Sequence, residues 1–110
     1  MSRFSCIIQE GSAADEQRAE LEARLTAHHQ AFYPGEEVAV GFMAVPDGFM
    51  FTEGRPSTSS VIACLLQHET TLDQREPYMR GICDLWSAVT GCTDHEIVVS
   101  VTDAATARSD

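Results

Sequence analysis

Basic residues and long hydrophobic runs are scarce in this sequence. Seven basic residues stand against 17 acidic ones, which gives a formal charge of −10 and a pI near 4.6. Nucleic acids and anionic membranes are bound through basic surfaces, so we expect neither as a partner. No apolar run approaches the ~18 residues of a membrane span. The first apolar stretch turns polar at Gln9, too early for a secretory signal, so we expect a cytoplasmic protein.

Patterns typical of metal sites and disulfide frameworks are also missing. The cysteines show no CxxC spacing and no histidine at zinc-finger distance. His28 and His29 are neighbours in a predicted helix and would not share a face, while His68 and His95 are isolated in the sequence. We expect no metal, no other cofactor and no disulfide. The thiols predicted to stay reduced are Cys6, Cys64, Cys83 and Cys92.

An internal repeat is the strongest signal that is present. The 110 residues, 44% of them hydrophobic, suit one domain over 1–103 with a flexible tail at 104–110. Within that domain, three blocks recur in order at nearly one offset, which predicts two similar halves at about 4–45 and 60–102. The matching blocks are 6–9 with 64–67, 15–18 with 72–75 and 35–40 with 94–99.

Each half has the pattern strand, helix, strand. In the first, strands at 4–9 and 38–45 flank a helix that Ser12 caps and Pro34-Gly35 ends. Its buried face is predicted to carry Ala14, Leu21, Leu25, His28 and Phe32.

The second half repeats the order with strands at 60–67 and 95–101. Its helix starts at Thr70 or Thr71 and ends at Gly91. Pro77 predicts that this helix starts late or bends.

Two right-handed βαβ units predict one four-stranded sheet with both helices on one face. The run at 60–66 is apolar on both sides, which is typical of a strand buried on both faces. Two helices cannot cover the second face, where Val61, Ala63 and Leu65 would lie. A symmetric oligomer would cover it.

This order of elements resembles the tautomerase superfamily. Two short motifs support the resemblance: Gly54-Arg55-Pro56-Ser57 before an apolar strand, and Asp73-Gln74-Arg75 at the start of the second helix. The resemblance spans residues 2–103 and is closest to the longer, MIF-sized members, among 4-oxalocrotonate tautomerase-like and malonate semialdehyde decarboxylase-like proteins. It implies a tandem βαβ–βαβ fold of the α/β (α+β) class with a mixed sheet. It also implies a homotrimer with active sites at subunit interfaces.

In this family an N-terminal proline, exposed by loss of the initiator methionine, is the catalytic base or acid. Here Ser2 occupies that position, and its amine would be primary and, in its ordinary pKa range, largely protonated at neutral pH. If Met1 is retained, Ser2 has no free amine at all. The resemblance also places an acidic group near Glu36 and Glu37, where it would activate water or orient the substrate. The predicted catalytic residues are therefore Ser2, Glu36 and Glu37.

Substrate binding is predicted at the connector between the halves. An arginine near Arg55 binds the substrate carboxylate in this family, and a guanidinium suits that task because its planar fork matches a carboxylate. Arg3 beside Ser2 is a second candidate. Phe51, with its apolar neighbours, would form a pocket wall or an intersubunit contact.

These residues predict a protein that binds or transforms a small carboxylated keto–enol or unsaturated acid, with weak or altered activity because Ser2 replaces proline. The reaction would be a tautomerisation or a related decarboxylation, hydration or dehalogenation. One alternative is a non-catalytic homotrimer of the same fold. Another is a ferredoxin-like domain such as a small monooxygenase, which has a similar order of elements.

Overall fold

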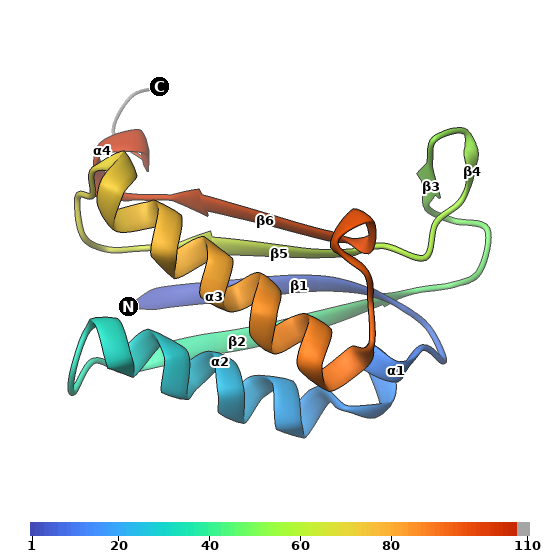
Figure 1. Ribbon diagram of the computed structural model, residues 1–110, viewed down its shortest axis with the longest axis horizontal. Helices are drawn as coiled ribbons and strands as arrows, with labels where there is room; N and C mark the ends of the chain where they lie inside the picture. Colours follow the sequence, from blue (N-terminus) through green and yellow to red (C-terminus); the bar gives the residue numbers. More distant parts are fainter. Residues whose placement is uncertain (108–110) are drawn as a thin grey trace.

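The computed structural model describes residues 1–107, which form two layers: a four-stranded sheet and two long helices packed on one of its faces (Figure 1). The elements, in chain order, are β1 (Ser2–Gln9), α1 (Ala13–Glu16), α2 (Arg18–Phe32), β2 (Val38–Val45), β3 (Phe51–Thr52), β4 (Arg55–Pro56), β5 (Ser60–Leu65), α3 (Leu72–Thr90), the 3₁₀ helix η1 (Asp94–Glu96), β6 (Ile97–Thr102) and α4 (Ala104–Ala107).

The sheet has the order β2-β1-β5-β6 and is mixed. The outer strands run parallel to their neighbours, β1 with β2 and β5 with β6, while the central pair β1 and β5 is antiparallel. This arrangement confirms the predicted fold class and the placing of both helices on one face. The ferredoxin-like alternative is wrong, because it requires antiparallel pairs where two parallel βαβ units are found.

The strand registers relate the two halves by a local two-fold axis. Ser5 of β1 lies opposite Ala63 of β5, and these two residues are 58 positions apart, as are the strands of the sequence repeat. In the first half Ser2 lies opposite Val38 of β2. In the second half Ser60, 58 positions after Ser2, lies opposite Ile97 of β6.

The first helical segment is interrupted, and the end of its buried face differs from the prediction. Ser12 caps α1 by accepting a hydrogen bond from the backbone N–H of Asp15, as expected. The helix then breaks at Gln17, and α2 begins anew at Arg18. Leu21 and Leu25 face the core as predicted, but the next buried residue is His29 and not His28. The predicted core position of Phe32 is also wrong, since this side chain is 40% exposed.

The second helix begins and ends through clear capping interactions. Thr71 and Gln74 form a capping box at its start, and Gly91 ends it in the left-handed conformation at φ 78°. A late start is therefore wrong: α3 begins five residues before Pro77, which lies inside the helix. The last strand begins at Ile97 and not at 95, because His95 belongs to η1.

The core lies between the sheet and the two helices. Every second residue of β1 contributes to it, and α3 contributes three large side chains. No helix within the described residues has the length and apolar character that crossing a membrane demands. The buried apolar residues are Phe4, Cys6, Ile8, Ala14, Leu21, Leu25, Ile62, Cys64, Leu66, Tyr78, Ile82, Trp86 and Ile97.

The opposite face of the sheet carries apolar side chains that this protomer leaves uncovered. In β5 the side chains of Ile62 and Cys64 are buried against the helices, whereas Leu65 is 43% exposed. The strand is thus buried on one face only within the protomer. Met43 of β2 and Val98 of β6 are more exposed still. We call this surface the open face.

The connector between the halves folds into a hairpin of its own. β3 and β4 pair with each other, and Glu53 and Gly54 at the tip both have positive φ, which is typical of a type I′ turn. Figure 1 shows the hairpin at the opposite end of the sheet from the N-terminus. Of the tail predicted to be flexible, 104–107 form α4, and 108–110 lie outside the described residues.

Candidate active site

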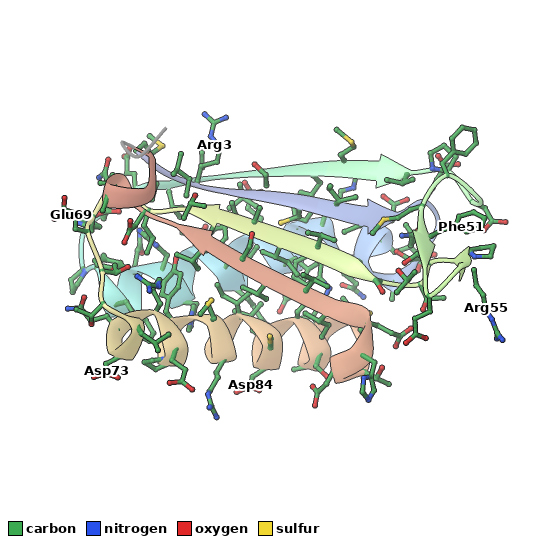
Figure 2. The ribbon with its side chains drawn as sticks, turned by 90° about the horizontal axis from the view of Figure 1, so that it is seen from above. Arg3, Phe51, Arg55, Glu69, Asp73 and Asp84 are labelled. Carbon is green, nitrogen blue, oxygen red and sulfur yellow. The ribbon has the colours of Figure 1, made fainter. Side chains whose placement is uncertain are left out.

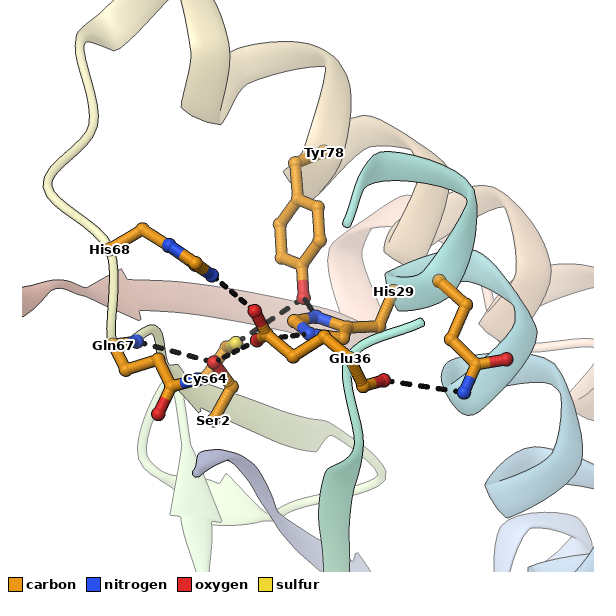
Figure 3. A network of polar contacts seen from close by, with 8 residues as sticks. Ser2, His29, Glu36, Cys64, Gln67, His68 and Tyr78 are labelled. Atoms are coloured by element: carbon orange, nitrogen blue, oxygen red, sulfur yellow. Dashed lines mark hydrogen bonds and ion pairs between the residues drawn. The ribbon is translucent and has the colours of Figure 1, made fainter. Parts of the chain in front are cut away.

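Polar side chains from four separate segments meet at the end of the sheet where β1 begins (Figure 3). Ser2 comes from β1, His29 from the last turns of α2, His68 from the loop after β5, and Tyr78 from α3. All four surround Glu36 or its partners, and Glu36 lies in the turn before β2.

The turn after α2 places Glu36 at this position. Helix α2 ends at Phe32, with Tyr33 as its C-cap. Gly35 then adopts φ 77°, a conformation that is strained for residues with a Cβ atom but not for glycine. The chain reverses there, and the Glu36 backbone is held by two hydrogen bonds. Its N–H donates to the Tyr33 carbonyl at 3.2 Å, and its carbonyl accepts from the Gln30 side chain at 3.3 Å.

The Glu36 carboxylate accepts three hydrogen bonds. Oε1 accepts from Ser2 Oγ and from His29 Nε2, each at 2.8 Å, and Oε2 accepts from His68 Nε2. Ser2 Oγ also accepts from the backbone N–H of Gln67 at 3.2 Å, so its hydroxyl is both donor and acceptor. These contacts join the start of β1 to the ends of α2 and β5.

The pKa of Glu36 reflects two opposed effects. Burial alone would raise it, because a carboxylate loses hydration, and the side chain is only 13% exposed. The hydrogen bonds from His68, Ser2 and His29 outweigh burial and lower the pKa from 4.5 to about 2. Glu36 is therefore ionised at neutral pH and acts as an acceptor only.

His29 connects this carboxylate to the core. Its side chain is fully buried, and its Nδ1 lies 2.8 Å from the Tyr78 hydroxyl, which in turn lies 3.6 Å from Cys64 Sγ. Burial raises the pKa of Tyr78 and so keeps its hydroxyl protonated. With Tyr78 donating to Nδ1, His29 donates from Nε2 to Glu36.

His68 lies at the surface of the cluster. Its side chain is 38% exposed, and its ring stacks on Tyr33 with centroids 4.4 Å apart and planes 6° apart. One ring nitrogen contacts Glu36. Among the polar residues of the cluster, His68 thus combines contact with the carboxylate and access to solvent.

The predicted site residues are divided among three places. Ser2 and Glu36 are in contact, while Glu37 is exposed beside the cluster. Arg3 points away from the helices on the open face, and Phe51 and Arg55 lie on the distant hairpin (Figure 2).

A hollow of about 280 Å³ adjoins the hairpin. It is lined by Arg55, by several hydroxyl side chains, and by His95 and Glu96 of η1. Phe51 is 60% exposed and does not line it. This hollow lies beside the hairpin, and the Glu36 cluster lies where β1 begins. Within one protomer, the hairpin and the start of β1 are at opposite ends of the sheet (Figure 1).

Metal-ligand chemistry is a poor match for the cluster. His29 and His68 use their Nε2 atoms as hydrogen-bond donors to different oxygens of Glu36. In residues 1–107 no group of three or more His, Cys, Asp or Glu side chains is arranged so that it could hold a metal ion. All four cysteines are free, and burial raises the pKa of Cys6 to about 12 and that of Cys64 to about 11, so these thiols are poor nucleophiles.

Sequence reasoning missed the histidine partners of Glu36. His68 is not isolated, because the antiparallel pairing of β1 with β5 brings the residues after Leu65 next to Ser2. The repeat could have indicated this pairing, since two-fold related strands meet antiparallel at the axis. His29 was missed because a step of three residues from Leu25 was expected, whereas the buried residues of α2 follow at steps of four, at Leu21, Leu25 and His29.

No protein-family model and no curated protein matches the sequence. Several solved structures are nevertheless similar in fold. Native Ps01740 is 28% identical with a TM-score of 0.83, and 92% of each chain is covered. Pt0534 inactivated by 2-oxo-3-pentynoate is 19% identical with a TM-score of 0.81, over 92% of this chain and 84% of that one. Fused 4-OT in an asymmetric trimer is 21% identical with a TM-score of 0.80, over 92% and 85%.

Proposed function

Since the chain has the fold of the tautomerase superfamily, we propose that it catalyses proton transfer on a small carboxylated keto–enol or unsaturated acid in the cytoplasm. The observation that carries this proposal is the contact between Ser2 and the ionised Glu36. The resemblance assigns the Ser2 position to the catalytic terminus, and here that position is tied to a buried carboxylate with two histidines.

The substrate class is supported by a structural neighbour. Pt0534 is inactivated by 2-oxo-3-pentynoate, a small 2-oxo acid. This compound carries a carboxylate for an arginine to bind and a ketone next to it. A 2-oxo acid with a CH₂ group at C3 has the same two groups and, in addition, a proton at C3 that a base can remove. Both features match what the resemblance predicts for this chain.

The assembly is proposed to be a homotrimer that completes the site. The open face leaves Met43, Leu65 and Val98 in water, and fused 4-OT is trimeric. In such a trimer, Arg55 and Phe51 of one subunit would reach the Glu36 cluster of another. Arg3 on the open face would then lie at the interface.

The expected activity is weak, because a secondary amine is missing. If Met1 is removed, Ser2 supplies a primary amine, and if Met1 stays, Ser2 supplies only its hydroxyl. The Ser2→Pro variant favours removal of Met1 and places a secondary amine at the site.

The test compares the two proteins with an enolpyruvate whose ketonisation is followed by ultraviolet absorbance. Intact mass establishes whether Met1 is present in each. We expect slow turnover by wild type and faster turnover by Ser2→Pro. Equal rates would contradict the role given to the missing amine. No turnover by either protein, with no binding of a 2-oxo acid, would favour the non-catalytic homotrimer.

A further inference from the structure

His68 and Glu36 have the arrangement of a histidine oriented by a carboxylate. The two side chains come from different halves of the chain and are in direct contact. The His68 backbone is held as well, since its carbonyl accepts a hydrogen bond from Ala104 at 3.3 Å. Stacking on Tyr33 fixes the plane of the ring.

Glu36 determines which ring nitrogen of His68 is basic. An ionised carboxylate can only accept, so Nε2 carries the proton that it donates to Oε2. The lone pair of the neutral ring then lies on Nδ1. No side chain between residues 1 and 105 forms a hydrogen bond with that nitrogen, and the His68 side chain is 38% exposed. Nδ1 is therefore available to an incoming molecule.

His29 cannot take the same role. Its side chain is fully buried, and both ring nitrogens are engaged, one by Tyr78 and the other by Glu36. Its contact, like that of Ser2, holds Oε1 in place while Oε2 faces His68. The carboxylate is thus fixed on one side and presented to a solvent-accessible imidazole on the other.

We propose that His68 is the proton-transfer residue of this site, with Glu36 as its positioning residue, in place of the amine that the fold family uses. This rests on the proposed function. For a 2-oxo acid, the Nδ1 lone pair takes a proton from C3, and the C–H electrons form the C2–C3 double bond. The C2–O π electrons move to oxygen, which takes the proton back from Nδ1. The product is the enol, with no net gain or loss of protons.

A carboxylate-oriented imidazole is suited to this task because the carboxylate stabilises the imidazolium that forms. Proton transfer by such a side chain typically contributes about 10²- to 10⁴-fold in rate. The competing base is the terminal amine. The chain has no lysine, so carbamylation with cyanate can neutralise that amine without touching another one.

The experiment follows deuterium incorporation at C3 of 2-oxobutanoate by NMR in D₂O. We expect His68→Phe, which can still stack on Tyr33, to lose at least about a hundredfold in exchange rate. His68→Gln is a second variant in case the first does not fold. His68→Ala should regain activity when imidazole is added, which a structural role would not produce. Arg80→Ala, on the exposed surface of α3, is the matched control and should retain the wild-type rate.

The outcomes distinguish the role proposed for His68 from the proposed proton-transfer function. Exchange that survives in both His68→Phe and His68→Gln but disappears on carbamylation would overturn the role of His68 and leave the proposed function intact. Absence of exchange in wild type would overturn both. Exchange that survives carbamylation, falls in the His68 variants and returns with imidazole would support both.

Discussion

Glu36 is a carboxylate that loses hydration and is kept charged by its neighbours. Its pKa of about 2 in the folded protein lies below the ordinary 4.5. The folded state therefore binds this proton less readily than the unfolded chain does, so stability due to Glu36 is fully present above about pH 4.5. It is lost as the pH falls from there towards 2. The difference corresponds to roughly 3 kcal/mol at neutral pH.

We expect Glu36→Gln to lower the free energy of unfolding by about 1–3 kcal/mol at pH 7. An amide oxygen accepts weaker hydrogen bonds than a carboxylate, and the new NH₂ group would face the hydrogen-bond donors that now contact Glu36. The deficit relative to wild type should shrink as the pH falls towards 3, where wild type loses its own advantage. Urea unfolding at several pH values measures both effects. Glu37→Gln is the matched control, since Glu37 is exposed and should show neither.

The sequence alone could single out Glu36 as a candidate but not its environment. Glu36 and Glu37 are equivalent by composition, and only the turn at Gly35 decides that the first points inward. His68 lies 32 residues further along the chain, and its contact with Glu36 depends on how the two halves pair. The internal repeat can indicate which strands pair, but it does not show that the His68 side chain meets Glu36.

The two helices approach each other closely where α2 crosses α3. Gly81 of α3 faces the ring of His28, and a Cβ atom at position 81 would lie 2.1 Å from His28 Cε1. The ring has little room to move, because its Nε2 lies 2.9 Å from the Tyr78 carbonyl oxygen and Phe32 packs beside it. Close packing thus explains a glycine inside a helix, where it usually costs about 1 kcal/mol relative to alanine.

We expect Gly81→Ala to destabilise the protein by roughly 1–3 kcal/mol despite the better helix propensity of alanine. In a His28→Ala background the same change should be neutral or stabilising by up to about 1 kcal/mol, because the obstructing ring is gone. Thermal and urea unfolding of the four proteins form a double-mutant cycle. Equal effects of Gly81→Ala in both backgrounds would show that the close approach does not limit packing.

The ends of helices were predictable from the sequence where a local capping residue sets them. They were less predictable where tertiary packing sets them. Ser12, Thr71 and Gly91 predicted helix ends because caps act within one turn of the chain. The break at Gln17 has no proline or glycine to announce it. For β3 and β4 the sequence predicted only a connector between the halves, because two-residue strands carry too little pattern.

The open face is the feature that favours self-association of this molecule in solution. Leu65 lies opposite Arg3 in the central strand pair, with Met43 and Val98 on the flanking strands. Apolar side chains exposed on a sheet face are unfavourable in water, and no element among residues 1–107 covers these three. The sequence predicted this need from the count of helices alone.

We expect wild type to sediment at three times the mass of one chain at micromolar concentration. Leu65→Glu should produce folded monomers, since the new carboxylate can pair with Arg3 in water but would be desolvated at an interface. Leu72→Glu changes an exposed leucine on α3 in the same way and should leave the trimer intact. Sedimentation velocity distinguishes the species. A wild-type monomer would contradict the proposed assembly.

Arg55 links the assembly to ligand binding. If it binds the carboxylate from a neighbouring subunit, Arg55→Ala should weaken binding of 2-oxobutanoate by roughly ten- to a hundredfold, with Arg55→Lys in between. Thermal melts should barely change because the residue is exposed. Calorimetric titration measures binding, with Arg80→Ala as the control on exposed α3. Unchanged affinity in Arg55→Ala would make Arg55 a surface residue only.

The local two-fold axis also makes two backbone positions equivalent whose chemistry differs. Ser2 and Ser60 begin equivalent strands and are both buried, at 0% and 3% exposure. Ser60 follows Ser59 within the chain, so its nitrogen belongs to an amide and has no amine to titrate. One end of this protein holds an ionised cluster, and the other holds a hairpin with Arg55. The symmetry relates the backbone and not the side chains around it, and one fold therefore has two chemically different ends.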